Sequence, residues 1–190
     1  MSEKLVRAFF AAEIDDDLRR RLAKVIADLD RVGARVRWVR PENLHWTVKF
    51  LGEVPWLETG NIAEAAREVC AGHEAFEGRV TGVGPFPPGR RVRVVAARMD
   101  DLGRMGAVRD DLEPSLEGFG VPPDGRGFKA HLTLGRVKGG RRLRELTEAL
   151  DAYADKDFGE CYIEELVLFQ SELARSGPNY TALARIPLGG

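Results

Sequence analysis

The chain has 190 residues, enough for one compact domain or two small lobes with a buried core. Hydrophobic residues make up 44% and charged residues 31%, which is typical of an ordinary soluble globular protein. The formal net charge is −1, so the whole molecule does not attract nucleic acid by its charge. An anionic ligand would need a local cluster of cations.

The N-terminal segment Met1 to Arg7 has no long apolar stretch and no small-residue cleavage site, so we expect no signal peptide. No run approaches the roughly 18 apolar residues that a membrane-spanning helix requires. Cys70 and Cys161 form neither a CxxC pair nor another metal-ligand spacing. We therefore expect both to be reduced core residues of a cytoplasmic protein with no membrane partner.

The first half of the chain alternates predicted strands and helices. Alternating apolar runs indicate strands, and apolar residues at three- and four-residue spacing indicate helices. The acidic trio Asp15 to Asp17 suits the N-cap and first turn of the first helix, where free N–H groups favour negative charge. In chain order the elements are a strand at 5–14, a helix at 18–29, strands at 35–39 and 44–52, a helix at 62–70 and a strand at 76–86.

The second half repeats this order. Its elements are a strand at 91–98, a helix at 102–116, a strand at 130–136, a helix at 143–153 and strands at 162–169 and 180–186. The spacing between His45 and His131 also carries the apolar strand 6–10 onto 92–96. We interpret this agreement of element order as an internal duplication, with halves at about 1–89 and 90–190.

Two such halves predict a bilobal α+β fold. Each half would form one lobe, an antiparallel sheet with helices packed on its outer face. The two histidine-containing strands would line a cleft between the lobes. Because no Pro/Ser-rich linker separates the halves, we expect one compact catalytic domain.

A short motif of His, an apolar residue, Thr and another apolar residue occurs once in each half, at 45–48 and at 131–134. Side chains alternate faces along a strand, so each His shares a face with the Thr two residues later. Trp46 and Leu132 would then face the core. Two histidines can act as general base and general acid at one phosphorus or carbonyl centre. Arg136, near the second motif, could add a charge-assisted contact to a phosphate.

Other aromatic and histidine positions have simpler interpretations. Regular alternation places Phe50 on the face opposite His45. Trp38, Phe86 and Tyr180 are candidates for base stacking, although packing in the core or in loops explains each of them. His73 lies just past a predicted helix, where we expect a solvated residue with no role in catalysis.

Signatures of several other chemistries are missing from the sequence. It contains no GxSxG elbow, no HExxH, no Walker-A loop and no GxGxxG after a strand. Two histidines without a nearby pattern of cysteines or carboxylates make a poor metal site. The residues favour metal-independent phosphoester chemistry by a histidine pair. They leave open two structural histidines on half-buried strands, and nucleic-acid binding without catalysis.

The segments 41–54 and 128–136 resemble the paired motifs of the 2H phosphoesterases. Within these they are most similar to the RNA 2′,3′-cyclic phosphodiesterases, also called 2′-5′ RNA ligase-like proteins, and the resemblance covers nearly the whole chain. Ala130 stands where the family often has Pro, and Gly135 where Ala is frequent. Loss of the Pro relaxes the backbone before the strand and should not remove the chemistry.

The resemblance implies hydrolysis of an RNA 2′,3′-cyclic phosphate to a 2′-phosphate end, without a metal or nucleotide cofactor. It implies His45 as proton donor to the leaving O3′ and His131 as proton acceptor from the attacking water, an order that the sequence leaves open. Thr47 and Thr133 would hold the non-bridging oxygens, and Arg136 would neutralise charge on the phosphate.

The implied partners are RNA with 2′,3′-cyclic phosphate ends or nucleoside 2′,3′-cyclic phosphates, and we expect a monomer. Joining of tRNA-half-like ends through a 2′-5′ linkage is implied more weakly. Two alternatives stay open. One is an RNA-end binding module without useful catalysis, and the other is a 2H phosphodiesterase with another 2′-5′ or small cyclic phosphate substrate.

Overall fold

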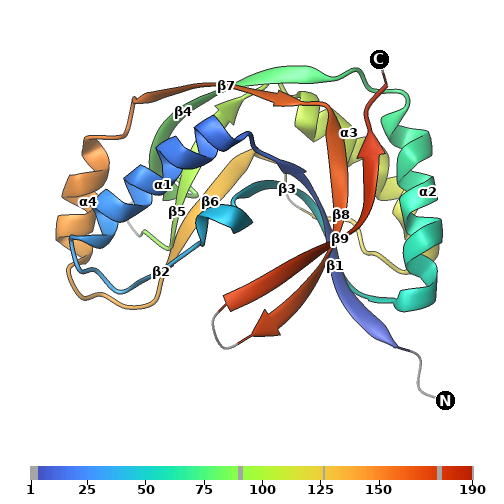
Figure 1. Ribbon diagram of the computed structural model, residues 1–190, viewed down its shortest axis with the longest axis horizontal. Coiled ribbons are helices and arrows are strands. Elements are labelled where there is room, and N and C mark those ends of the chain that lie inside the picture. Colours follow the sequence, from blue (N-terminus) through green and yellow to red (C-terminus); the bar gives the residue numbers. More distant parts are fainter. Residues whose placement is uncertain (1–3, 90–91, 126, 175–176, 190) are drawn as a thin grey trace.

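The computed structural model describes residues 4–89, 92–125, 127–174 and 177–189. It confirms the α+β class, with two antiparallel sheets that form an arch (Figure 1). Sheet A has the strand order β3-β1-β8-β9 and sheet B the order β2-β6-β5-β4-β7. The strands are β1 (Leu5–Glu13), β2 (Val36–Trp38), β3 (His45–Pro55), β4 (Phe76–Phe86), β5 (Val94–Asp100), β6 (His131–Val137), β7 (Asp157–Ile163), β8 (Glu165–Ala174) and β9 (Gly177–Pro187).

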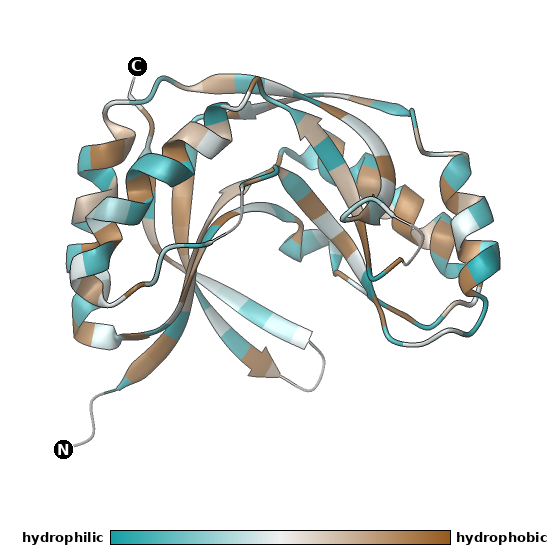
Figure 2. Cartoon of the chain, turned by 180° about the vertical axis from the view of Figure 1, so that it is seen from behind, coloured by the Kyte–Doolittle hydropathy of each residue, from teal (hydrophilic) through white to brown (hydrophobic). Residues whose placement is uncertain are grey.

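The helices cover the outer sides of the arch (Figure 1). They are α1 (Asp16–Asp30), α2 (Thr59–Cys70), α3 (Arg104–Leu116) and α4 (Leu143–Asp151), with short 3-10 turns at Pro41–Asn43, Trp56–Glu58 and Glu117–Phe119. Helices α1 and α4 pack beside sheet B, and α2 and α3 pack beside sheet A. Hydrophobic and hydrophilic residues alternate along the helices (Figure 2), as helices with one buried side require.

The start of α1 follows the expectation from the acidic trio. Asp15 is the N-cap, and its Oδ1 accepts a hydrogen bond of 2.7 Å from the backbone N–H of Leu18. Asp16 and Asp17 occupy the first turn. Both features stabilise a helix N-terminus, because they meet free N–H groups and the positive end of the helix dipole.

The strands predicted at 91–98 and 162–169 differ from the structure in their limits. The strand predicted at 91–98 is β5, which begins at Val94, and Arg91 lies outside the described residues. The single strand predicted at 162–169 is divided at Glu164 between β7 of sheet B and β8 of sheet A. The apolar pattern continues across the break because Ile163 and Leu166 are both buried, each against its own sheet.

The two sheets do not follow the two sequence halves, so the expectation that each half forms its own lobe is wrong. Sheet A combines β1 and β3 with β8 and β9, and sheet B combines β2 and β4 with β5, β6 and β7. The reason lies in the crossovers. The chain passes from one sheet to the other through α1 after β1, through the Pro41–Asn43 turn after β2, through α2 after β3, and at Glu164 after β7. One hydrophobic core therefore contains residues from both lobes.

A β-bulge interrupts β3 at Val48, the last residue of the first motif. In the pairing with β1, Thr47 and Lys49 have partners and Val48 between them has none. The extra residue reverses the alternation of side chains beyond it. Lys49 therefore turns into the protein interior, and Phe50 returns to the face of His45. The expectation from regular alternation was wrong for Phe50.

The second motif has a bulge at the matching position of β6. In the pairing with β5, Thr133 and Gly135 have partners and Leu134 has none. Gly135 is buried, and Arg136 returns to the exposed face. The bulge therefore brings Arg136 to the same side of β6 as Thr133.

The cysteines behave as core residues. Cys70 and Cys161 are free and buried, as expected. Burial raises the pKa of each thiol to about 11, so both stay protonated at neutral pH.

No helix in the described ranges is long and apolar enough to cross a membrane.

Candidate active site between the two histidine strands

His45 begins β3, and both of its ring nitrogens have partners. Nδ1 lies 2.8 Å from the carbonyl oxygen of Asn43, and Nε2 lies 3.0 Å from Oγ1 of Thr47. A carbonyl oxygen only accepts hydrogen bonds, so Nδ1 carries the proton and neutral Nε2 accepts from the Thr47 hydroxyl. The Asn43 amide donates to the carbonyl of Pro178 at 2.9 Å, which fixes this segment against β9.

His131 begins β6 and repeats the same anchor. Its Nδ1 donates to the carbonyl oxygen of Lys129 at 2.9 Å, two residues back along the chain. The ring stacks on Phe86, with centroids 3.7 Å apart and an interplanar angle of 12°. The neutral ring therefore presents an unprotonated Nε2, as that of His45 does.

Burial favours the neutral form of both imidazoles. It lowers the pKa of His45 to about 4, although the bond to Asn43 and the charge of Glu13 act in the opposite direction. It also lowers the pKa of His131, where the bond to Lys129 opposes the shift and the positive charge of Arg136 adds to it. Each ring is therefore ready to accept a proton, and donation requires prior proton uptake.

A cavity of about 370 Å³ lies between the two strands. His45, Thr47, Thr133 and Arg136 all line it. The cationic side chains among its lining residues are Arg7, Arg37, Arg40, Arg136 and Lys138. The lining contains no Asp or Glu within the described part of the chain. These cationic side chains form the local positive charge that an anionic ligand needs in a protein whose net charge is −1.

Aromatic rings line the cavity beside His45. Phe9 of β1 lies 5.0 Å from the His45 ring between centroids, and Tyr180 of β9 meets it edge-on at 5.3 Å. Phe9 also contacts Phe50 at 5.9 Å, and Trp38 lines the same cavity. Trp38 and Tyr180, considered only as candidates from the sequence, therefore belong to the site.

Sequence reasoning missed several lining residues. It did not single out Phe9 or Arg7, because their segment has the apolar pattern of a buried strand. The signal present was Arg7 itself, a charge within that apolar run and two residues from Phe9. Phe50 was missed because a bulge has no reliable sequence signature.

The structure brings most of the predicted site residues together. His45, Thr47, Thr133 and Arg136 share the cavity, and His131 lies on the same face of β6 as Thr133. Within the described ranges, no group of three or more His, Cys, Asp or Glu side chains could hold a metal ion. His73 contributes nothing to the cavity. It lies past the end of α2 with its side chain partly exposed, and its Nε2 lies 3.0 Å from a carboxylate oxygen of Asp111.

Comparisons with known proteins identify the family of the chain. The family model of the LigT-like phosphoesterases matches residues 13–96 and 101–180. Two proteins named RNA 2′,3′-cyclic phosphodiesterase are each 35% identical. That of Methanothermobacter thermautotrophicus is aligned over 93% of this chain and 95% of its own length, and that of Archaeoglobus fulgidus over 94% and 98%.

The solved structure of TT0787 from Thermus thermophilus is 27% identical. It superposes with a TM-score of 0.80 over 97% of this chain and 98% of its own. The match of the family model covers most of the sequence, including both histidine strands. The chain belongs to the LigT-like phosphoesterases of the 2H phosphoesterase superfamily.

Proposed function

We propose that the protein hydrolyses RNA 2′,3′-cyclic phosphate ends to 2′-phosphate ends, with His45 and His131 as an acid–base pair. The observation that carries this proposal is the shared anchor of the two histidines. In each motif Nδ1 donates to the carbonyl two residues back, which leaves Nε2 for chemistry. The cationic lining of the adjacent cavity and the names of the relatives support a phosphate substrate.

In the proposed reaction, Nε2 of His131 takes a proton from water as the water oxygen attacks phosphorus. The bond from phosphorus to O3′ breaks, and His45 donates a proton from Nε2 to O3′. Thr47 donates to neutral His45, so protonation of Nε2 frees its hydroxyl hydrogen for a phosphate oxygen. Thr133 would hold a second oxygen, and the Arg136 charge would stabilise the dianionic transition state.

The depressed pKa of His45 sets a condition on this assignment. A pKa of about 4 keeps the ring neutral at pH 7. A bound phosphate anion favours the charged imidazolium, so substrate would have to bring about the uptake of a proton. The reverse assignment, with His45 as base and His131 as acid, needs the same uptake at His131.

A sulfur atom in place of O3′ separates the two assignments. A thiolate leaves without protonation, so a cyclic substrate with bridging 3′-sulfur should restore activity to a variant that lacks only the acid. We expect rescue of His45→Ala and not of His131→Ala. Rescue of His131→Ala alone would reverse the assigned roles.

The direct test incubates the protein with nucleoside 2′,3′-cyclic phosphates and with an RNA oligonucleotide that ends in a cyclic phosphate. We expect the 2′-phosphate product, in equal yield with and without EDTA. Binding of the oligonucleotide without turnover would replace the proposal by an RNA-end binding module. Turnover restricted to a linear 2′-5′ oligonucleotide would replace it by another 2H activity.

A parallel reaction at the same phosphorus uses a 5′-hydroxyl in place of water, breaks the same bond to O3′ and would form a 2′-5′ linkage. A second oligonucleotide with a 5′-hydroxyl, added at high concentration without ATP, tests it in the same assay. The monomeric state and cytoplasmic location stay predictions from the sequence.

A further inference from the structure

Lys49 is a buried cation directly behind the active-site strand. Only 1% of its side chain is exposed. Its Nζ lies 2.7 Å from Oε1 of Glu113 and 3.1 Å from Oδ2 of Asp124, and it donates to the carbonyl of Pro122 at 2.9 Å. These three acceptors come from α3 and from the loop between α3 and β6, so Lys49 joins β3 to both.

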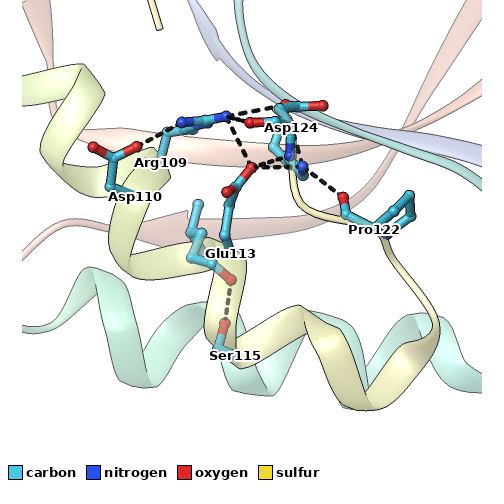
Figure 3. Close-up of polar contacts among 8 residues, drawn as sticks. Arg109, Asp110, Glu113, Ser115, Pro122 and Asp124 are labelled. Carbon is cyan, nitrogen blue, oxygen red and sulfur yellow. Dashed lines mark hydrogen bonds and ion pairs between the residues drawn. The ribbon is translucent and has the colours of Figure 1, made fainter. Parts of the chain in front are cut away.

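The acceptors are themselves held in a larger ion cluster (Figure 3). Arg109 pairs with Asp110 at 2.6 Å and with Glu113 at 2.9 Å, and it donates to the Asp124 carbonyl at 3.1 Å. The backbone N–H of Asp124 donates to Glu113 at 2.8 Å. Burial alone would raise the pKa of Glu113, but the bonds from Lys49 and Asp124 and the nearby cations hold it below its usual range.

The position of Lys49 is not the one that hydrophobic burial alone would select. A regular β3 would place Trp46, Val48 and Phe50 together in the core and would leave Lys49 in the open cleft. The bulge at Val48 does the reverse, because it buries Lys49 and leaves Phe50 56% exposed. Burial of a charge is costly unless the charge is paired, so the cluster offsets the cost of this register.

The second motif has the same bulge without a buried ion. Gly135 occupies the position of Lys49, and the side chains of Trp38 and Val36 pack against its bare backbone. A Cβ atom there would lie 2.6 Å from the Trp38 ring and 2.7 Å from Val36. The interior position after each bulge is therefore specified, in one strand by a paired cation and in the other by the absence of a side chain.

We propose that Lys49 is a positioning residue. Its contacts with Glu113, Asp124 and the Pro122 carbonyl hold the bulge that keeps Phe50 in the cleft. The expected effect on turnover rests on the proposed function and on a contact between the nucleoside and Phe50, which lines the cavity. The register itself is independent of any substrate, so it can be tested without one.

The reactivity of a thiol introduced at position 50 measures the register of β3. In the Phe50→Cys protein, the introduced thiol is the one exposed thiol among the described positions, since Cys70 and Cys161 are buried. Adding Lys49→Thr removes the long cation and leaves a side chain that either strand face accepts. We expect the introduced thiol to react with a thiol reagent at least about tenfold more slowly, as an interior position reacts only on local opening.

Lys49→Met is the second variant, because it keeps the length of the side chain and removes only its charge. We expect a rate between those of the parent and the Lys49→Thr protein. Ser115→Ala is the matched control, because Ser115 lies on α3 like Glu113 but outside the ion cluster. This substitution should leave the rate unchanged. Parent reactivity in both Lys49 variants would overturn the proposal. If Lys49→Thr unfolds the protein, three thiols react quickly and the Lys49→Met rate decides.

Kinetics then separate positioning from a loss of folded protein. Lys49→Met should raise KM for a nucleoside 2′,3′-cyclic phosphate with a smaller effect on kcat. In a Phe50→Ala background it should add no further increase in KM. A fall in kcat that adds fully to the Phe50→Ala effect would indicate a structural role only. Absence of turnover in the unaltered protein would refute the proposed function and leave the thiol experiment valid.

Discussion

The two motif strands, β3 and β6, are alike up to their bulges and different beyond them. Each presents a histidine anchored through Nδ1, a threonine on the same face, and an unpaired residue directly after it. The next two positions are Lys49 and Phe50 in β3 but Gly135 and Arg136 in β6. The repeated part supplies two equivalent groups for proton transfer. The divergent part places an aromatic side chain on the β3 side of the cleft and a cation on the β6 side.

This difference suits a substrate that is itself asymmetric. On the β3 side, Phe9, Phe50 and Tyr180 form an apolar wall beside His45. On the β6 side, burial lowers the pKa of His131, and the positive charge of Arg136 adds to this shift. A nucleotide has an apolar base and an anionic phosphate, so one wall can contact each part.

Removal of either histidine should have the largest effect, because it breaks the part that the two strands share. We expect His45→Ala and His131→Ala each to lower turnover by about 10²–10⁴-fold, the usual loss for one acid or base. Both proteins should keep the unfolding midpoint of the parent within a few degrees. His73→Ala, outside the cleft, is the control and should turn over normally. Near-normal turnover in either cleft variant would end the acid–base assignment.

Replacing Arg136 tests the divergent part. Arg136→Met keeps most of the aliphatic stem and removes the charge, so we expect kcat/KM to fall by about 10–10²-fold, in keeping with loss of one charge-assisted contact. The remaining activity should also depend less on salt concentration. Arg144→Met on α4, whose side chain is 89% exposed, is the control. An unchanged kcat/KM would remove Arg136 from the site.

The sequence predicted the strand face of the motif residues better than the walls of the cavity. The shared face of His45 and Thr47, and that of His131 and Thr133, were predictable because these residues precede the bulge in each strand, where side chains still alternate. Phe50 was placed on the wrong face because a bulge inserts one residue with no change in composition.

The assignment of strands to sheets was also beyond the sequence pattern. Element order repeats between the halves, but order alone does not say which sheet a strand joins. The crossovers through α1 and α2 and the break at Glu164 decide this, and they interleave the halves. Arg136 was found because its charge stands near the motif, although the bulge is the reason that it faces the cleft.

Gly135→Ala tests whether the β6 bulge depends on a bare backbone. The new Cβ would meet Trp38 and Val36 well inside van der Waals distance, so we expect a loss of stability of about 1–3 kcal/mol, as for other overpacked sites. Urea unfolding measures it. Gly60→Ala is the control, because nothing lies within 4 Å of its added Cβ. If Gly135→Ala were as stable as that control, Trp38 would move freely and would not be a fixed wall of the cavity.

The smallest predicted effect concerns the burial of the His45 side chain. Because burial lowers its pKa, His45 makes the stability of the protein depend on pH. Its pKa is about 4 in the folded protein, against about 6.5 in an unfolded chain. Between these values the unfolded state binds more protons, so stability rises with pH. The contribution is complete above the unfolded value and is lost as pH falls toward the folded one.

Lowering the pH from 7 to 5 should therefore cost about 1–2 kcal/mol through His45. The measurement compares the free energy of unfolding in urea at the two pH values for the parent and for His45→Gln, which has no titrating group at this position. We expect the parent to lose more stability than the variant. Groups that titrate elsewhere, including His131, act in both proteins and cancel. An equal loss in both would mean that the His45 ring is hydrated in solution, and the argument that substrate must bring about its protonation would then fail.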